Sequence, residues 1–125
     1  MKKTKILIVD DEVAFTNIVK LTLEMNEHYE VYAENNPLSA IATGRRFCPD
    51  IILLDVVMPD MDGGELQTQF MADSTLRRIP IMFLTAIVQQ NEVDEHNGCI
   101  GGQFFLAKPV SADGLIEAID EHIRS

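Results

Sequence analysis

A set of polar residues at the ends of apolar runs has the side chains that phosphoryl chemistry needs. They are Asp10, Asp11, Asp55, Thr85 and Lys108. Three carboxylates close together repel one another, and a hard divalent cation with oxygen ligands, such as Mg2+, would offset that repulsion. A phosphoryl group at the same place would meet the metal, the ammonium group and the hydroxyl, while the carboxylate of Asp55 could attack phosphorus. The residue types therefore predict a site that forms an aspartyl phosphate.

The apolar runs before these residues predict the strands that position them. Ile6-Leu7-Ile8-Val9 and Ile51-Ile52-Leu53-Leu54 have the continuous apolar character of strands buried on both faces of a parallel sheet. The predicted strands span residues 5–9, 29–33, 50–54, 81–84 and 103–107, and the second of them alternates as an edge strand does. Parallel sheets bind ligands at the carboxyl ends of their strands, so an acid in that position marks a site.

Apolar residues at helical spacing predict the helices between the strands. The predicted helices span residues 12–25, 36–47, 63–73 and 111–123, and the polar stretch 89–97 predicts a weakly anchored helix. The residues expected to face inward are Phe15, Ile18, Val19, Thr22 and Leu23, then Leu38, Ile41 and Ala42, then Leu66 and Phe70, and finally Ala112, Leu115, Ile116, Ile119 and Ile123.

Regular alternation of strand and helix predicts the fold class. It indicates an α/β fold with a doubly wound five-stranded parallel sheet, right-handed crossovers and helices on both faces. The first and third strands of such a sheet are neighbours, so Asp10, Asp11 and Asp55 are expected to lie together. Thr85 and Lys108 follow the fourth and fifth strands and are expected at the same rim.

Length and charge restrict the class of protein. With 125 residues, 46% of them hydrophobic, the chain is expected to form one domain over residues 1–125. Its net charge of -10 disfavours direct binding of nucleic acid. No apolar stretch approaches the roughly 20 residues that span a bilayer, and the start carries no cleavage signal, so no membrane association and a cytoplasmic location are expected. Cys48 and Cys99 are expected to be reduced thiols.

The motifs that carry the polar residues resemble the receiver domain of two-component response regulators. They are Ile8-Val9-Asp10-Asp11-Glu12, Leu54-Asp55-Val56-Val57-Met58-Pro59 with Gly63, Thr85-Ala86 and Lys108-Pro109, over essentially the whole chain. The resemblance implies the flavodoxin-like strand order 2-1-3-4-5. It also implies a phosphorylation-dependent signalling switch, which catalyses its own phosphotransfer and slow dephosphorylation but is not a turnover enzyme.

The resemblance assigns a role to each residue of the site. Asp55 would accept a phosphoryl group from a histidine kinase or a histidine phosphotransfer protein, with Mg2+ as cofactor. Asp11 would bind Mg2+ directly and Asp10 largely through water. The backbone carbonyl of Val57 would be a further ligand, beside Asp55. Lys108 would bridge the phosphoryl group and the carboxylate.

The resemblance also implies a switch between two states. Thr85 would turn its hydroxyl towards the phosphoryl group. Ala86 would have a side chain small enough to leave room for that group, with its backbone amide available there. Phe105 stands where the family frequently has tyrosine, so it could rotate between states but could not donate a hydrogen bond to a partner. The output face is expected between Thr85 and Phe105, together with the last helix. The output partner, phosphorylation-dependent dimerisation, and whether the chain stands alone or is part of a longer regulator or hybrid kinase stay open.

The same residues also have other interpretations. Asp10, Asp11 and Thr85 could each cap a helix, but capping does not account for their common place at strand ends. A phosphatase of the haloacid dehalogenase type needs a second aspartate two residues after the nucleophile, where this chain has Val57. A flavin carrier of the flavodoxin type binds phosphate after its first strand, where acidic residues would repel it. A receiver-like module that no longer accepts phosphate stays open.

The sequence predicts a long-lived phosphoryl group. Val57 and Ile87 lie two residues beyond Asp55 and Thr85, and in receiver domains these positions flank the path of the hydrolytic water. Both side chains are aliphatic, so they cannot orient that water. We expect slower loss of phosphate from the isolated protein than from relatives with polar residues there, measured as the decay of the phosphorylated mass with time. Rapid loss would contradict the prediction.

Overall fold

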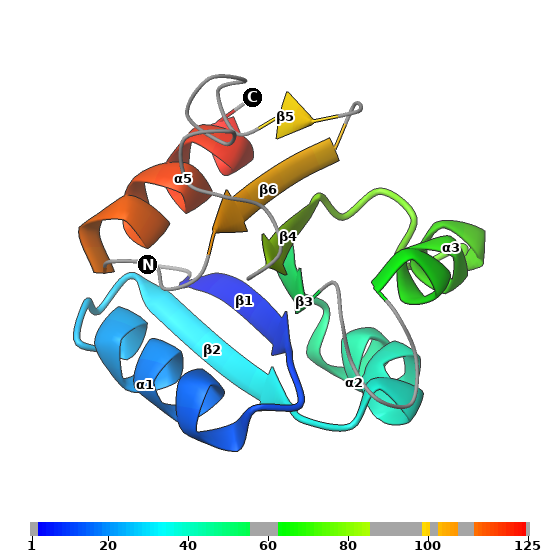
Figure 1. Ribbon diagram of the computed structural model, residues 1–125, viewed down its shortest axis with the longest axis horizontal. Helices are drawn as coiled ribbons and strands as arrows, with labels where there is room; N and C mark the ends of the chain where they lie inside the picture. The colour runs from blue at the N-terminus through cyan, green and yellow to red at the C-terminus, as the bar shows by residue number, and fades with distance from the viewer. Residues whose placement is uncertain (1–2, 56–62, 86–98, 101–102, 108–111, 125) are drawn as a thin grey trace.

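A sheet at the centre of the protein carries helices on both faces (Figure 1). The computed structural model describes residues 3–55, 63–85, 99–100, 103–107 and 112–124. The strands are β1 (Thr4–Val9), β2 (Tyr29–Glu34), β3 (Ile51–Asp55), β4 (Ile81–Thr85), β5 (Cys99–Ile100) and β6 (Gln103–Ala107). The helices are α1 (Val13–Glu24), the 3-10 turn η1 (Pro37–Ser39), α2 (Ala40–Phe47), α3 (Gly63–Ala72) and α5 (Ala112–Arg124). The helix predicted over residues 89–97 lies outside the described residues.

The strand order is β2-β1-β3-β4-β6-β5. All pairs from β2 to β6 are parallel, which confirms the predicted order, with β6 as the fifth strand of the prediction. The short strand β5 was not predicted, and it pairs antiparallel with β6. Its two residues are too few to show the alternation by which a strand is recognised in a sequence.

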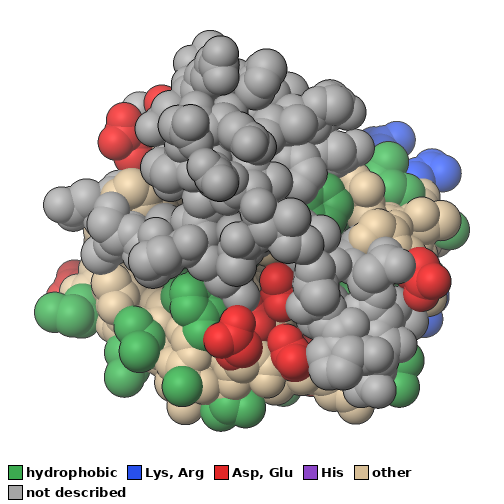
Figure 2. All heavy atoms as spheres, viewed as in Figure 1, with side chains coloured by type: hydrophobic (Ala, Val, Ile, Leu, Met, Phe, Trp, Pro, Cys, Tyr) green, Lys and Arg blue, Asp and Glu red, His purple; other side chains and the backbone are tan. Residues whose placement is uncertain are grey.

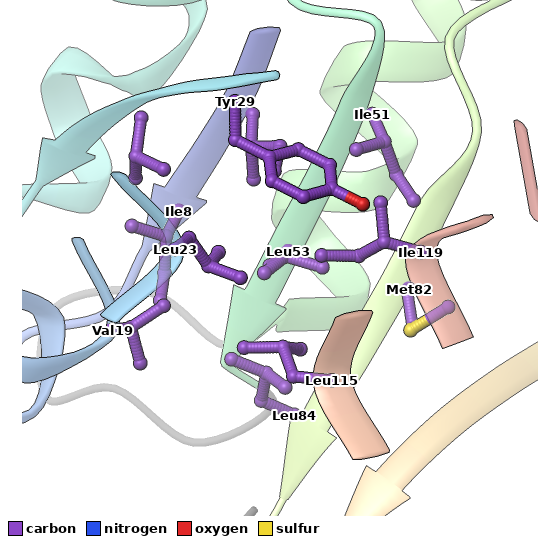
Figure 3. Close-up of a cluster of buried hydrophobic side chains, with 12 residues drawn as sticks. Ile8, Val19, Leu23, Tyr29, Ile51, Leu53, Met82, Leu84, Leu115 and Ile119 are labelled. Carbon is purple, nitrogen blue, oxygen red and sulfur yellow. The ribbon is translucent and has the colours of Figure 1, made fainter. Parts of the chain in front are cut away.

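Two apolar layers hold the sheet between its helices. Helices α1 and α5 cover one face, and α2 and α3 cover the other (Figure 1). Figure 3 shows the first layer, in which strand residues such as Ile8 and Leu53 meet Leu23 of α1 and Ile119 of α5. Alternate residues of β1 and β3 point into opposite layers, so their side chains from Ile6 to Val9 and from Ile51 to Leu54 are all 0% exposed.

The inward face of α1 differs from the prediction at two positions. Val19 and Leu23 are buried as expected, but Ile18 is 64% exposed and Thr16 is buried. A residue one step along a helix is rotated by about 100°, so a helix oriented by Val19 and Leu23 turns Ile18 away from the sheet. Ile18 was assigned to the core because it is apolar, and that assignment was wrong.

The inward face of the second predicted helix also differs. Asn36 accepts a hydrogen bond from the Leu38 amide at 3.0 Å and so caps the start of the turn, but Pro37–Ser39 form a 3-10 turn rather than an α-helical one. The tighter turn changes the phase of α2. Leu38 is therefore 65% exposed and Ala42 is exposed, contrary to the prediction, whereas Ala40 is buried. Among the other predicted inward residues, Leu66, Phe70, Leu115 and Ile119 are buried.

A buried carboxylate joins α2 to the segment that follows α3. Arg45 donates from Nε to Oδ2 of Asp73 at 2.6 Å, and the other oxygen of Asp73 accepts from the amides of Thr75 and Leu76. The Leu76 side chain in turn lies against Gly44, where a Cβ would come within 3.2 Å of it. Burial raises the pKa of Asp73, but the hydrogen bonds from Arg45 and the two amides outweigh that effect and hold the pKa below its usual value.

The lowered pKa of Asp73 predicts a pH-dependent contribution to stability. The pKa of Asp73 is lower in the folded state than in the unfolded state. Ionised Asp73 therefore stabilises the folded chain above pH of about 4, and this stabilisation is lost as the pH falls through the folded-state pKa. We expect Arg45→Met to lower the urea concentration at the midpoint of unfolding at neutral pH. The difference in midpoint between this variant and the unmutated chain should become smaller below pH of about 4. Arg78→Met, at an exposed arginine, is the control and should have no such pH dependence. An equal loss at every pH would show that packing alone explains the effect of Arg45.

Candidate metal centre

The carboxyl ends of β1 and β3 bring three carboxylates together. Val9 pairs with Leu54 in the parallel register, so the next residues, Asp10 and Asp55, lie at the same level of neighbouring strands. One carboxylate oxygen each from Asp10, Asp11 and Asp55 can be chosen so that all lie within 4.8 Å of one another. The structure thus places these three acids together, as the strand order led us to expect. Their individual roles stay predictions.

The three acids differ in their access to solvent. Asp10 is 0% exposed and Asp55 is 5% exposed, whereas Asp11 is half-buried. On the face seen in Figure 2, acidic side chains gather below the centre, over the carboxyl ends of β1 and β3 in Figure 1. Buried carboxylates cost free energy unless hydrogen bonds or a cation offset the cost. One such bond is present, because Oδ1 of Asp10 accepts from the amide of Glu12 at 2.9 Å, where the chain turns into α1.

Asn35 holds the main chain of this site and was not among the residues predicted from the sequence. Its Nδ2 donates to the carbonyl of Asp10 and to Oγ1 of Thr16, both at 2.8 Å. The amide of Asp10 also donates to the carbonyl of Glu34 at 3.2 Å. The available signal was an amide side chain directly after β2, beside the strand that carries the acids, together with a threonine inside the apolar face of α1. These bonds fix the position at which β1 delivers its acids.

The remaining predicted residues are only partly covered by the structure. Thr85 ends β4 and pairs with Ala107, the last residue of β6, and Asp55 pairs with Leu84. The backbone of Thr85 is therefore at the same rim of the sheet as Asp55. Phe105 has its backbone within β6, opposite Phe83 of β4. Three further predicted residues lie outside the described residues, namely Val57, Ala86 and Lys108.

The oxygen ligands present fit a hard divalent cation. Mg2+ is bound by oxygen at about 2.1 Å, so oxygens around one ion are at most about 4.2 Å apart, which small rotations of the side chains would reach. The partial exposure of Asp11 also leaves room for the waters that Mg2+ keeps. Asp10, Asp11 and Asp55 would hold the ion, which would supply positive charge to offset their repulsion.

Fold and site together define a doubly wound α/β domain with an acidic cluster at the switch point of its sheet. A family model described as the response regulator receiver domain matches residues 6–120 of the chain. The chain therefore belongs to the response regulator receiver domain family.

Known proteins resemble the chain over most of its length. Chemotaxis protein CheY of Listeria monocytogenes is 34% identical over 118 residues, which cover 94% of this chain and 96% of that protein. Response regulator PleD of Caulobacter vibrioides is 38% identical over 107 residues, which cover 85% of this chain but only 23% of PleD. The structure of chemotaxis protein CheY4 of Vibrio cholerae superposes with a TM-score of 0.80 at 28% identity, covering 95% of this chain and 98% of the other. The similarity thus concerns the receiver domain, which is nearly all of CheY and a small part of PleD.

Membership of the receiver domain family decides between the signalling switch, the phosphatase and the flavin carrier. Receiver domains of two-component systems are phosphorylation-dependent signalling switches rather than turnover enzymes, and they interact with phosphodonors and with output partners. The phosphatase and flavin-carrier interpretations are therefore set aside. No helix within the described part of the chain is both long and apolar enough to cross a membrane.

Repulsion among the acids predicts that removing one of them stabilises the metal-free protein. We expect Asp10→Asn to raise the free energy of unfolding by about 1 kcal/mol in the presence of a chelator, since asparagine keeps the oxygen that accepts from Glu12 but lacks the charge. Mg2+ that binds only the folded site should stabilise the unmutated chain more than the variant. Urea unfolding with a chelator and with millimolar Mg2+ measures both effects.

Asp50→Asn is the matched control, because it makes the same substitution at the exposed residue before β3, at the opposite end of that strand. It should not stabilise the protein, and it should leave the response to Mg2+ unchanged. A metal-free Asp10→Asn chain that is less stable than the unmutated one would show that repulsion is not the dominant interaction at the site.

Proposed function

We propose that Asp55 is the phosphoryl acceptor of this receiver domain. The observation that supports this most strongly is the place of its carboxylate, which ends a fully buried strand beside two further acids within 4.8 Å. A carboxylate oxygen of Asp55 would attack the phosphorus of a phosphohistidine donor. A P–O bond forms as the P–N bond to the imidazole breaks, and the imidazole takes up a proton. The product is an acyl phosphate on Asp55 and a neutral histidine on the donor.

The proposal gives each neighbouring residue a task. Asp10 and Asp11 would hold Mg2+ beside Asp55, and Asn35 keeps the main chain of Asp10 in place. When bound, the cation would offset the negative charge of the phosphoryl oxygens. With 5% of its surface exposed, Asp55 would be reached from a narrow direction only, which limits access of water to the acyl phosphate. We further propose that the backbone carbonyl of Val57 is a ligand and that Lys108 contacts the phosphoryl group.

The proposed output runs from the site towards α5. Added negative charge would draw in the side chains of Thr85 and Lys108, with Ala86 and Phe105 responding as the family pattern implies. Leu84, the residue before Thr85, shares a core layer with Leu115 and Ile119 of α5. A change at the carboxyl end of β4 would therefore alter the packing beneath that helix. The extent of the domain over residues 1–125 and the cytoplasmic location stay predictions, and the identities of the kinase and of the output partner stay open.

Phosphorylation can be tested directly by intact mass. We expect the protein to gain one phosphoryl group when it is incubated with Mg2+ and acetyl phosphate, and to gain none in a chelator. Asp55→Asn should abolish the gain, because the amide is a poor nucleophile. Asp50→Asn is the matched control and should be phosphorylated like the unmutated chain.

Modification of Asp55→Asn to the same extent as the unmutated chain would place the phosphoryl group elsewhere. If Mg2+ binds but neither acetyl phosphate nor a phosphohistidine protein phosphorylates the chain, the proposal fails in favour of a receiver that acts by contact alone.

A further inference from the structure

Strand β2 forms one edge of the sheet and pairs only with β1 among the described strands. The carbonyl of Glu34 accepts from the amide of Asp10, so this residue of β2 faces the β1 side. Alternate residues of a strand in a parallel pair point their main-chain groups in opposite directions. Val31, an odd number of residues away, therefore directs its N–H and C=O away from β1. Such outward groups are a template for pairing with another strand.

Two side chains of α1 occupy both outward groups of Val31. Lys20 donates from Nζ to the carbonyl of Val31 at 2.7 Å, and the Val31 amide donates to Oε2 of Glu24 at 2.9 Å. Lys20 and Glu24 also pair with each other at 3.0 Å. Nearby, the amide of Tyr29 donates to the carbonyl of Asn26 at 3.2 Å. Hydrogen bonds from outside the sheet thus occupy both outward groups of Val31 and the amide of Tyr29.

The ion pair between Lys20 and Glu24 contributes little to the helix itself. The two side chains are 41% and 32% exposed, and surface ion pairs are typically worth less than about 1 kcal/mol. Lysine also precedes glutamate here, which is the less favourable order for a pair four residues apart. Burial raises the pKa of Glu24, but the bond from Val31 and the charge of Lys20 outweigh it and keep the pKa below its usual value. The contacts with Val31 are therefore the distinctive feature of the pair.

Exposed apolar side chains occur on both elements that form this edge. Leu21 and Met25 follow Lys20 and Glu24 on α1 and are 69% and 85% exposed, and Tyr32 of β2 is 44% exposed. Figure 2 shows apolar side chains over the region where Figure 1 places α1. An uncovered edge strand tends to pair with another edge, and two copies of one edge are self-complementary about a two-fold axis. The partner that this edge fits is a second copy of the chain.

We propose that Lys20 and Glu24 form an edge guard, which prevents β2 from pairing with β2 of a second copy of this chain. The guard satisfies the main chain of Val31 within one molecule, so a second copy would have to break two hydrogen bonds before it could pair. It also places two charged groups where the neighbouring strand would lie, and strand pairing would have to desolvate them. Without these side chains, the strand of a second copy would provide the partners for Val31.

Removal of both guard side chains tests the proposal. We expect Lys20→Ala/Glu24→Ala to self-associate, with a sedimentation mass that rises with concentration from 14.0 kDa towards twice that value, while the unmutated chain shows no such rise. Alanine is the strongest helix former, so α1 should remain folded, which circular dichroism checks. Adding Ala33→Pro removes an outward N–H two residues beyond Val31 and should return the mass to that of the unmutated chain.

Glu24→Gln is the matched control, because it keeps an oxygen that can accept from Val31, and it should behave like the unmutated chain. A folded double-alanine variant with no more self-association than the unmutated chain would overturn the proposal. Association that Ala33→Pro does not reverse would also overturn it, since the contact would then lie elsewhere.

Amide exchange of the single variant Glu24→Ala gives an independent measurement. The Val31 amide should exchange at least about tenfold faster in dilute solution and slow again as the protein concentration rises, because a second copy then protects it. Exchange that does not depend on concentration would contradict the proposed role.

Discussion

The parallel register between β1 and β3 is the constraint on which the site depends. It places Asp10 and Asp55 at the same level of two strands whose apolar side chains are completely buried. Three mutually repelling acids at such a point oppose folding, so the two apolar layers must offset that cost. The packed sheet therefore holds the acids closer together than their repulsion alone would allow. A cation or a phosphoryl group at the site would change the free energy of that repulsion.

Side-chain hydrogen bonds connect the sheet to its helices at both ends of the strands. At the acidic end, Asn35 connects the carbonyl of Asp10 to Thr16 of α1. Away from the site, Tyr29 of β2 donates to Asp120 of α5 at 2.7 Å, which ties the last helix to the edge strand. Helices α1 and α5 also share the apolar layer that contains Leu84 of β4 (Figure 3). A change in charge at the site is thus made next to the packing that positions α5.

Similarity to known receivers shows which features the fold tolerates. A TM-score of 0.80 with the Vibrio cholerae protein accompanies only 28% identity, so most side chains differ while the arrangement of elements is kept. Apolar volume and its pattern are sufficient to maintain such a core. Exposed features of α1 are less constrained by packing, which is why apolar residues such as Ile18 and Met25 can lie on its outer surface. Such residues are not needed for the core, and scattered apolar residues are common on protein surfaces.

The amino-acid sequence by itself predicted the five parallel strands in their order along the chain and the meeting of the acids at one rim, but not the short strand β5. Continuous short apolar runs predict buried strands, and their alternation with helices leaves few ways to connect them. The structure decided the phase of α1 and the 3-10 form of η1, in which Ile18 and Leu38 point outward. It also decided that Arg45 meets Asp73, 28 residues away, and that side chains of α1 cover Val31. Local sequence patterns show which residues of an element are apolar or charged. Their partners depend on how elements distant in the sequence pack together, and sequence periodicity does not contain that information.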